Sequence, residues 1–233
     1  MKKLILAATG LFVFTMLNAQ TLDEIVKKYS IANKLDKVSG LSTVKITAKM
    51  SMMGMDMTME MWMKNPNKIK TVTSVQGQDI IAVFDGEKGY SLNPMTGSNV
   101  PVEMTPDQIK QTLNNNIFQN NLVKYLKNGQ LSLEGEDKVN DKPAFKIKAN
   151  LDGGNTAYMF IDKGSFLLVK TSATVNQGGQ TMNVDSYPSD YKETNGFLLP
   201  MKTTTSAAGM EIVMTFDKVE VNVPMEDSLF KIK

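Results

Sequence analysis

Residues 44–63 read VKITAKMSMMGMDMTMEMWM, and apolar side chains alternate with polar ones on both sides of a central Met53-Gly54 pair. Alternation with a period of two is typical of a strand with one buried face, and a two-residue turn containing glycine is typical of a hairpin. A hairpin centred on this turn places Met52 opposite Met55 and then continues outward in register. A slip of one residue would mix the two faces, so the pattern predicts a single pairing.

Methionine supplies most of the apolar face of this predicted hairpin. Branched residues suit a strand better, whereas methionine is flexible and polarizable and adapts to partners of variable shape. Three interpretations follow: a packed core, an adaptable lipid-contacting surface, or a copper(I) site built from soft thioethers. The sulfurs are spread along the strands and the chain has no histidine to supplement them, which argues against copper.

The N-terminus has the organisation of a secretory signal peptide. Lys2 and Lys3 precede an apolar run over residues 4–17, and Ala19 is the small residue expected before a cleavage site. We expect cleavage of residues 1–19, which leaves residues 20–233 as one domain. The apolar run is too short to require a membrane span and no later run approaches spanning length, so we expect a soluble mature protein.

The chain contains no cysteine, histidine or arginine. An exported domain without disulfides depends on a hydrophobic core, and a lipid-modified N-terminal cysteine is excluded. Serine, cysteine and zinc hydrolase sites cannot be assembled, and the carboxylates stand mostly at predicted turns such as Asp85, Asp162 and Asp190. We therefore predict no enzymatic activity, no catalytic residue, no metal site and no cofactor.

The charge balance excludes another class of partner. Without Lys2 and Lys3, the chain has 24 lysines against 24 acidic residues. A neutral chain without arginine has neither the basic patch nor the planar fork used to bind nucleic acids, so we expect no nucleic-acid partner.

The remaining patterns predict a mainly β, α+β fold. A capping box at Thr21-Leu22-Asp23-Glu24 starts a helix to about residue 35. A second start at Thr105-Pro106-Asp107-Gln108, with Pro at the first helical position and Gln at the capping-box position, begins a helical insert. Its Asn114–Asn116 run has weak helix propensity, so two short helices with a soft joint are expected. The other segments predict the strands 68–76, 79–84, 89–93, 131–134, 144–151, 156–161, 167–175, 181–187, 200–206 and 211–221, with turns at Gly153-Gly154 and Gly178-Gly179. They form a strongly curved antiparallel sheet.

Several segments in order resemble the periplasmic outer-membrane lipoprotein carriers, the LolA-like lipoprotein-sorting family. They begin with the helix start LDEI and continue with MKNPNK, FDGEKGY, NPMTG, FID, DYKETNGFLLP and DSLFKI, at residues 22–25, 63–68, 84–90, 93–97, 160–162, 190–200 and 227–232. Each segment alone is a weak signal, but the ordered set covers nearly all of the mature chain.

The resemblance implies an unclosed β-barrel whose concave face is covered by helices, with acyl chains held between them. It also implies a periplasmic location and transfer from an inner-membrane releasing complex to an outer-membrane acceptor. Known carriers close the lid with an arginine, which this chain lacks.

The residue patterns and the family resemblance together predict a monomeric periplasmic carrier. It would bind the acyl chains of lipoproteins, or another lipid, for transfer toward the outer membrane. A lipid- or stress-sensing module on the same fold is the alternative from another class, because a fold does not fix a function. The predicted lipid-binding residues of cavity and lid are Met50, Met52, Met55, Met57, Met59, Met61, Ile109, Leu113, Ile117 and Phe118.

Overall fold

The computed structural model describes residues 20–97, 99–114, 116–118, 121–151, 155–177 and 180–232. The expected signal peptide and the two expected turns at Gly153-Gly154 and Gly178-Gly179 lie outside this part of the chain. The helices are α1 (Leu22–Ala32), α2 (Leu35–Val38), α3 (Pro106–Asn114), α4 (Asn121–Lys127), η1 (Pro94–Thr96) and η3 (Asp227–Phe230). The strands are β1 (Thr43–Met52), β2 (Met55–Lys64), β3 (Lys68–Val75), β4 (Gln78–Phe84), β5 (Gly89–Leu92), β6 (Val102–Glu103), β7 (Leu131–Val139), β8 (Lys142–Asn150), β9 (Thr156–Asp162), β10 (Leu168–Gln177), β11 (Gln180–Thr194), β12 (Phe197–Ala207) and β13 (Met210–Val221).

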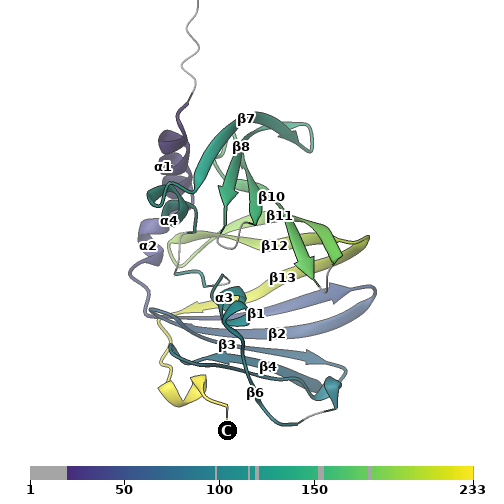
Figure 1. Cartoon of the computed structure of the whole chain (residues 1–233). Coiled ribbons are helices and arrows are strands. Elements are labelled where there is room, and N and C mark those ends of the chain that lie inside the picture. The colour runs from purple at the N-terminus through teal and green to yellow at the C-terminus, as the bar shows by residue number, and fades with distance from the viewer. Residues whose placement is uncertain are drawn as a thin grey trace, which may run out of the picture.

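Within the described residues, thirteen strands form one antiparallel sheet, in the order β6-β5-β4-β3-β2-β1-β13-β12-β11-β10-β9-β8-β7. The chain starts at the centre, runs outward to β6, crosses to the opposite edge at β7 and returns to the centre at β13. The two edge strands do not pair in this part of the chain, so the curved sheet stays open. The crossing between the edges carries α3 and α4, which therefore lie across the concave side (Figure 1). The predicted mainly β fold, an unclosed antiparallel barrel with helices over its concave face, is confirmed.

The hairpin forms with the predicted register. Ten pairs join β1 and β2, from Met52 opposite Met55 at the turn to Thr43 opposite Lys64 at the base. Both turn residues adopt the left-handed conformation, with φ of 53° at Met53 and 79° at Gly54. Two successive positive φ values are those of a type I′ turn, whose twist matches that of the flanking strands.

The apolar face of the hairpin changes from core to surface along its length. Toward the base, Ile46 and Met63 are 0% and 1% exposed, and Met57, close to the tip, is also only 7% exposed. Met55 at the tip is 41% exposed, and Met53 in the turn is 74% exposed. The packed-core interpretation therefore describes the base and Met57. The adaptable-surface interpretation can apply only to the methionines of this face that are partly or fully exposed, Met50, Met52, Met55 and Met59.

Two apolar clusters fill the concave side. The first lies under α2 and the insert and contains Val38, Leu41, Val44, Ile46, Met61, Met63, Ile69 and Phe197. The second lies under α1 and α4 and contains Ile25, Val26, Leu122, Phe145, Ile147 and Ile161. Each half of the sheet thus buries its own cluster beneath a different pair of helices. Figure 1 shows the two pairs, α2 with α3 and α1 with α4.

The predicted capping boxes are present at both helix starts. The Thr21 amide donates to Glu24 Oε2 at 3.0 Å and the Glu24 amide donates to Thr21 Oγ1 at 3.3 Å. Thr105 and Gln108 make the same reciprocal pair at 2.8 and 3.3 Å. These bonds satisfy amides that the first turn of a helix leaves without partners.

Some predicted boundaries were wrong. The first helix ends at Ala32 rather than near residue 35, because Asn33 caps it and Lys34 takes a left-handed conformation. The Asp85 and Asp162 turns are confirmed by carboxylates that accept backbone amides. Asp190, however, lies inside β11: its φ of 53° is tolerated by aspartate, and pairing with β12 continues past it. The two-residue edge strand β6 was not predicted.

An exposed carboxylate of the C-terminal helix η3 forms ion pairs with two lysines of the sheet. Asp227 contacts Lys64 Nζ at 2.7 Å and Lys68 Nζ at 2.8 Å. The hydrogen bonds from Lys64 and then Lys68 lower the pKa of Asp227 to about 2.

Within the described residues, no helix has the length and apolar character needed to cross a membrane.

Replacement of Asp227 by asparagine should lower the melting temperature slightly at pH 7. The folded-state pKa lies below the value of about 3.9 expected for an unfolded chain. The stabilisation of the fold by the ionised Asp227 is therefore fully present above pH ~4 and is lost as the pH falls through about 2. Thermal melts of the two proteins should converge as the pH falls below about 2, and a difference that persists well below that pH would assign the loss to packing.

Candidate functional site

A cavity of about 310 Å³ lies between the concave face and the helices. Strands β9 to β12 form its floor, and α1, α2, α4 and the α3–α4 joint form its roof. Its lining is Tyr29, Asn33, Leu35, Ile117, Asn121, Leu122, Met159, Ile161, Leu168, Pro188, Tyr191, Leu198, Leu199 and Pro200. The cavity is therefore mainly apolar, with four polar side chains around it. Such a lining is typical of small-molecule sites, which combine hydrophobic walls with a few polar groups.

The two tyrosines of the cavity differ in their hydrogen bonding. The Tyr191 hydroxyl donates to the Leu168 carbonyl at 2.8 Å and so ties β11 to β10. The Tyr29 hydroxyl makes no hydrogen bond within the described residues. Burial raises the pKa of Tyr29 to about 12, and burial together with the neighbouring Tyr29 raises the pKa of Tyr191. Both hydroxyls therefore stay protonated at physiological pH.

The roof is held in place by Asn33 and Asn116. Asn33 Nδ2 donates to the Tyr29 carbonyl at 2.8 Å, and the Leu198 amide donates to the Asn33 carbonyl at 3.3 Å, which joins the end of α1 to β12. Asn116 is 2% exposed, and its side chain donates to the Pro66 carbonyl at 3.1 Å and accepts the Phe118 amide at 3.0 Å. Asn116 thus attaches the joint between α3 and α4 to the turn between β2 and β3. Helix propensity alone had indicated a soft joint at this run.

The predicted lid residues lie on the concave side. Leu113, Ile117 and Phe118 pack against the cluster that contains Met61, and Ile117 also lines the cavity. Ile109 sits over Gly89, where a side chain would come within 2.9 Å of it. A side chain at position 89 would therefore force both Ile109 and Met104 to shift.

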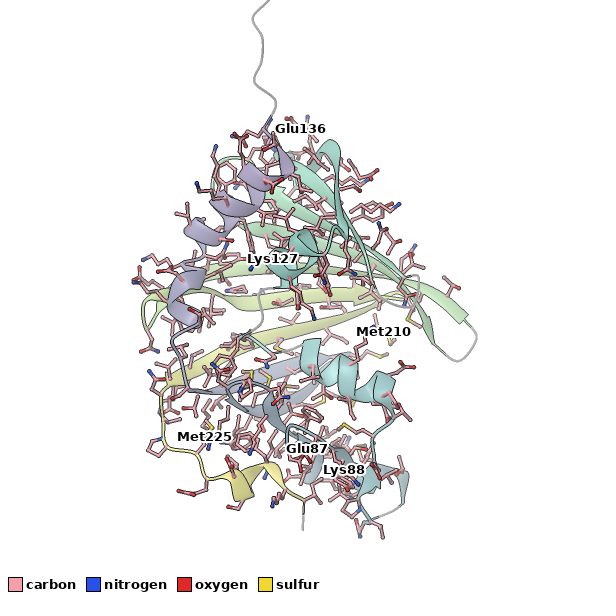
Figure 2. The ribbon with its side chains drawn as sticks, turned by 60° about the vertical axis from the view of Figure 1, so that its left-hand side comes forward. Glu87, Lys88, Lys127, Glu136, Met210 and Met225 are labelled. Atoms are coloured by element: carbon pink, nitrogen blue, oxygen red, sulfur yellow. The ribbon has the colours of Figure 1, made fainter. Side chains whose placement is uncertain are left out.

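The structure does not bring the six predicted methionines together at one site; two of them, Met50 and Met57, line a common hollow, of about 260 Å³, between β1, β2 and β13. Met61 and Met59 lie in or against the cluster beneath the insert. Met57 is buried, Met50 and Met52 are partly exposed, and Met55 is exposed. None of these six lines the 310 Å³ cavity. Figure 2 shows Met210, another exposed methionine at the end of a neighbouring strand, far from α1 and α2.

Most of the cavity residues were missed by the sequence prediction. Tyr29 belongs to the apolar stripe of the first helix, and residues 198–200 lie in the segment FLLP that carries part of the LolA-like resemblance. Neither the helical stripe nor the family resemblance predicts that Tyr29 and residues 198–200 line one cavity. Met159 and Ile161 alternate on β9, as expected for a half-buried strand, and give no sign of a cavity by themselves.

Another hollow, beside the C-terminal segment, is larger but chemically different. It measures about 630 Å³, and its lining combines the charged Lys70, Glu226 and Lys231 with six apolar residues, Ile81, Leu92, Pro224, Met225, Leu229 and Ile232. These three charges make it a poorer match to an acyl chain than the 310 Å³ cavity, whose lining side chains are all neutral. Within the described residues, no group of three or more acidic, cysteine or histidine side chains could hold a metal ion.

No protein-family model and no curated protein sequence matches the chain. Similar solved structures include an outer membrane lipoprotein-sorting protein domain from Vibrio parahaemolyticus, with a TM-score of 0.60, 11% identity and coverage of 90% of this chain and 95% of that chain. A LolA superfamily protein from Nitrosomonas europaea has a TM-score of 0.58, 13% identity and coverage of 92% and 99%. A DUF1329 family protein from Desulfovibrio piger has a TM-score of 0.58, 11% identity and coverage of 89% and 97%. The chain therefore has a LolA-like fold, as the ordered segments indicated.

Proposed function

From this LolA-like fold and its apolar cavity, we propose that the protein is a carrier that shields acyl chains of a lipoprotein or another lipid from water. The observation that carries the proposal is the 310 Å³ cavity between β9–β12 and the helices. Its volume corresponds to roughly ten groups of the size of a water or a methylene. Burial of one methylene is worth about 0.8 kcal/mol, so an acyl segment of that length is held by several kcal/mol.

The methionine face supplies a continuation of this site. Ile117, Leu35 and Leu199 line the cavity and also pack against the cluster that contains Met61. From there the face runs to the partly exposed Met50 and Met52 near the hairpin tip. A flexible methionine surface suits a chain that slides in and out, because it repacks around different shapes. We propose that cargo longer than the cavity extends along this face under α3.

The carrier acts in the periplasm in this proposal, between a releasing complex at the inner membrane and an acceptor at the outer membrane. The signal-peptide pattern of residues 1–19 supports export, and the LolA-like fold supports a lipid cargo. No catalytic step is needed, because the chain transfers its ligand unchanged.

Direct measurement of dye binding tests this function. Residues 20–233 should bind an environment-sensitive hydrophobic dye, which long-chain phospholipids and acylated peptides should displace. Met159→Trp fills the cavity floor and should weaken dye binding at least tenfold. The matched variant Met95→Trp, at a position 53% exposed in η1, should bind like the unchanged protein.

The outcomes separate the candidate functions. Loss of dye binding in Met159→Trp with an unchanged melting temperature supports the cavity as the site. No dye binding by the unchanged protein would contradict the carrier. A sensor would bind the lipid without speeding its movement between donor and acceptor vesicles, whereas a carrier should speed that movement.

A further inference from the structure

All polar side chains that line the cavity are neutral. They are Tyr29, Asn33, Asn121 and Tyr191, and no lysine, aspartate or glutamate is among the lining residues. The Tyr191 hydroxyl donates to the Leu168 carbonyl, and one N–H of the Asn33 side-chain amide donates to the Tyr29 carbonyl. Within the described residues, the Tyr29 hydroxyl and the Asn121 side-chain amide have no hydrogen-bond partner. These two groups, together with the second N–H of Asn33, are the donors left for a ligand.

The lysine next in sequence to the lining residue Asn33 is already paired. Lys34 Nζ lies 2.6 Å from Glu193 Oε2, outside the lining of the cavity. Its positive charge is therefore compensated by a carboxylate of the protein itself. A ligand carboxylate in the cavity would have no free cation among the lining residues.

This arrangement favours one class of acyl head group. A buried carboxylate without a cation is costly, whereas an ester or amide carbonyl needs only one or two donors. Building on the proposed carrier function, we propose that the cavity selects neutral acyl esters and amides and rejects free fatty-acid anions. The Tyr29 hydroxyl donates to the carbonyl oxygen of the ligand, and the Asn121 amide is the second donor.

The ligand comparison uses residues 20–233 loaded with a hydrophobic dye at pH 8. Methyl laurate and lauramide should displace the dye at concentrations at least tenfold lower than laurate. Equal displacement by laurate would overturn the selectivity while leaving the carrier intact. Failure of the protein to bind the dye at all would instead contradict the carrier function itself.

Two variants separate recognition from the lower water solubility of the ester. Tyr29→Phe removes the free hydroxyl and should weaken methyl laurate binding about fivefold while leaving dodecane binding unchanged. Tyr187 packs against the cluster that contains Phe160 on the other face of the sheet, and its hydroxyl donates to Asp185 Oδ2 at 3.5 Å. Tyr187→Phe removes a hydroxyl outside the cavity, so it should leave both affinities unchanged. Equal affinity of Tyr29→Phe and the unchanged protein for methyl laurate would remove Tyr29 from the proposal.

The reverse experiment adds the missing cation. Leu168→Lys places an ammonium group among the lining residues and should reverse the order, so that laurate displaces the dye at a lower concentration than methyl laurate. A circular dichroism melt checks that the variant is folded. An unchanged preference in a folded Leu168→Lys protein would show that charge does not set the selectivity.

Discussion

Truncation of Met63 to alanine should lower the free energy of unfolding by about 2–5 kcal/mol, the range measured for large apolar side chains in protein cores. Met63 is 1% exposed and belongs to the cluster under the insert, so its loss leaves a cavity that the surroundings cannot fill. Whole domains are stable by only about 5–15 kcal/mol, and the variant should therefore melt well below the unchanged protein. Urea unfolding followed by circular dichroism measures the difference.

Met55→Ala provides the matched control for this prediction. It removes the same side chain from the same face of the same strand, but at a position that is 41% exposed. The free energy of unfolding should change by no more than about 0.5 kcal/mol, as for most surface substitutions. A large loss from Met55→Ala would show that the whole methionine face is core and leave none of it for a ligand.

Leu113→Asp should weaken retention of a bound lipid or dye at least tenfold while the sheet stays folded. Leu113 is partly buried against the cluster that contains Met61, and a charge there is costly when α3 is closed. Strand pairing does not involve α3, and the joint that follows it stays fixed to Pro66 through Asn116. The substitution should therefore open the lid and leave the rest of the fold in place.

Hydrogen exchange measures this opening. The α3 amides should exchange faster than those of β1 and β2 and become protected when lipid binds, because contacts with the ligand favour the closed form. Ile31→Asp, at a position 66% exposed on α1, should retain ligand like the unchanged protein. Equal protection of α3 with and without lipid, or global unfolding of Leu113→Asp, would mean that the insert is fixed core.

The local architecture could be predicted because local patterns specify it. The ten pairs of the hairpin follow from alternation around Met53-Gly54, and both capping boxes follow from side chains three residues apart. The two short helices of the insert follow from weak propensity between two apolar stripes. The ordered segments then indicated the LolA-like fold.

The position of the cavity could not be predicted in the same way. It requires that Tyr29 near the N-terminus meet Tyr191 near the end of β11, and no periodicity encodes that meeting. The methionine pattern pointed to the opposite half of the sheet, where Ile109 of the insert packs closely against Gly89. The turn assigned at Asp190 failed for a related reason, since pairing with β12 overrides a local preference.

The unequal exposure of the hairpin methionines has a chemical consequence. Methionine is oxidised to its sulfoxide where an oxidant can reach the sulfur, and this chain has no cysteine to react first. Met53, Met55 and Met210, all at least 41% exposed, should take up oxygen quickly, while Met57, Met61 and Met63, all at most 8% exposed, should resist. A cargo bound on the methionine face should shield the partly exposed Met50 and Met52 from peroxide. Peptide mass spectrometry would detect this protection as a lower sulfoxide fraction at each of these two residues.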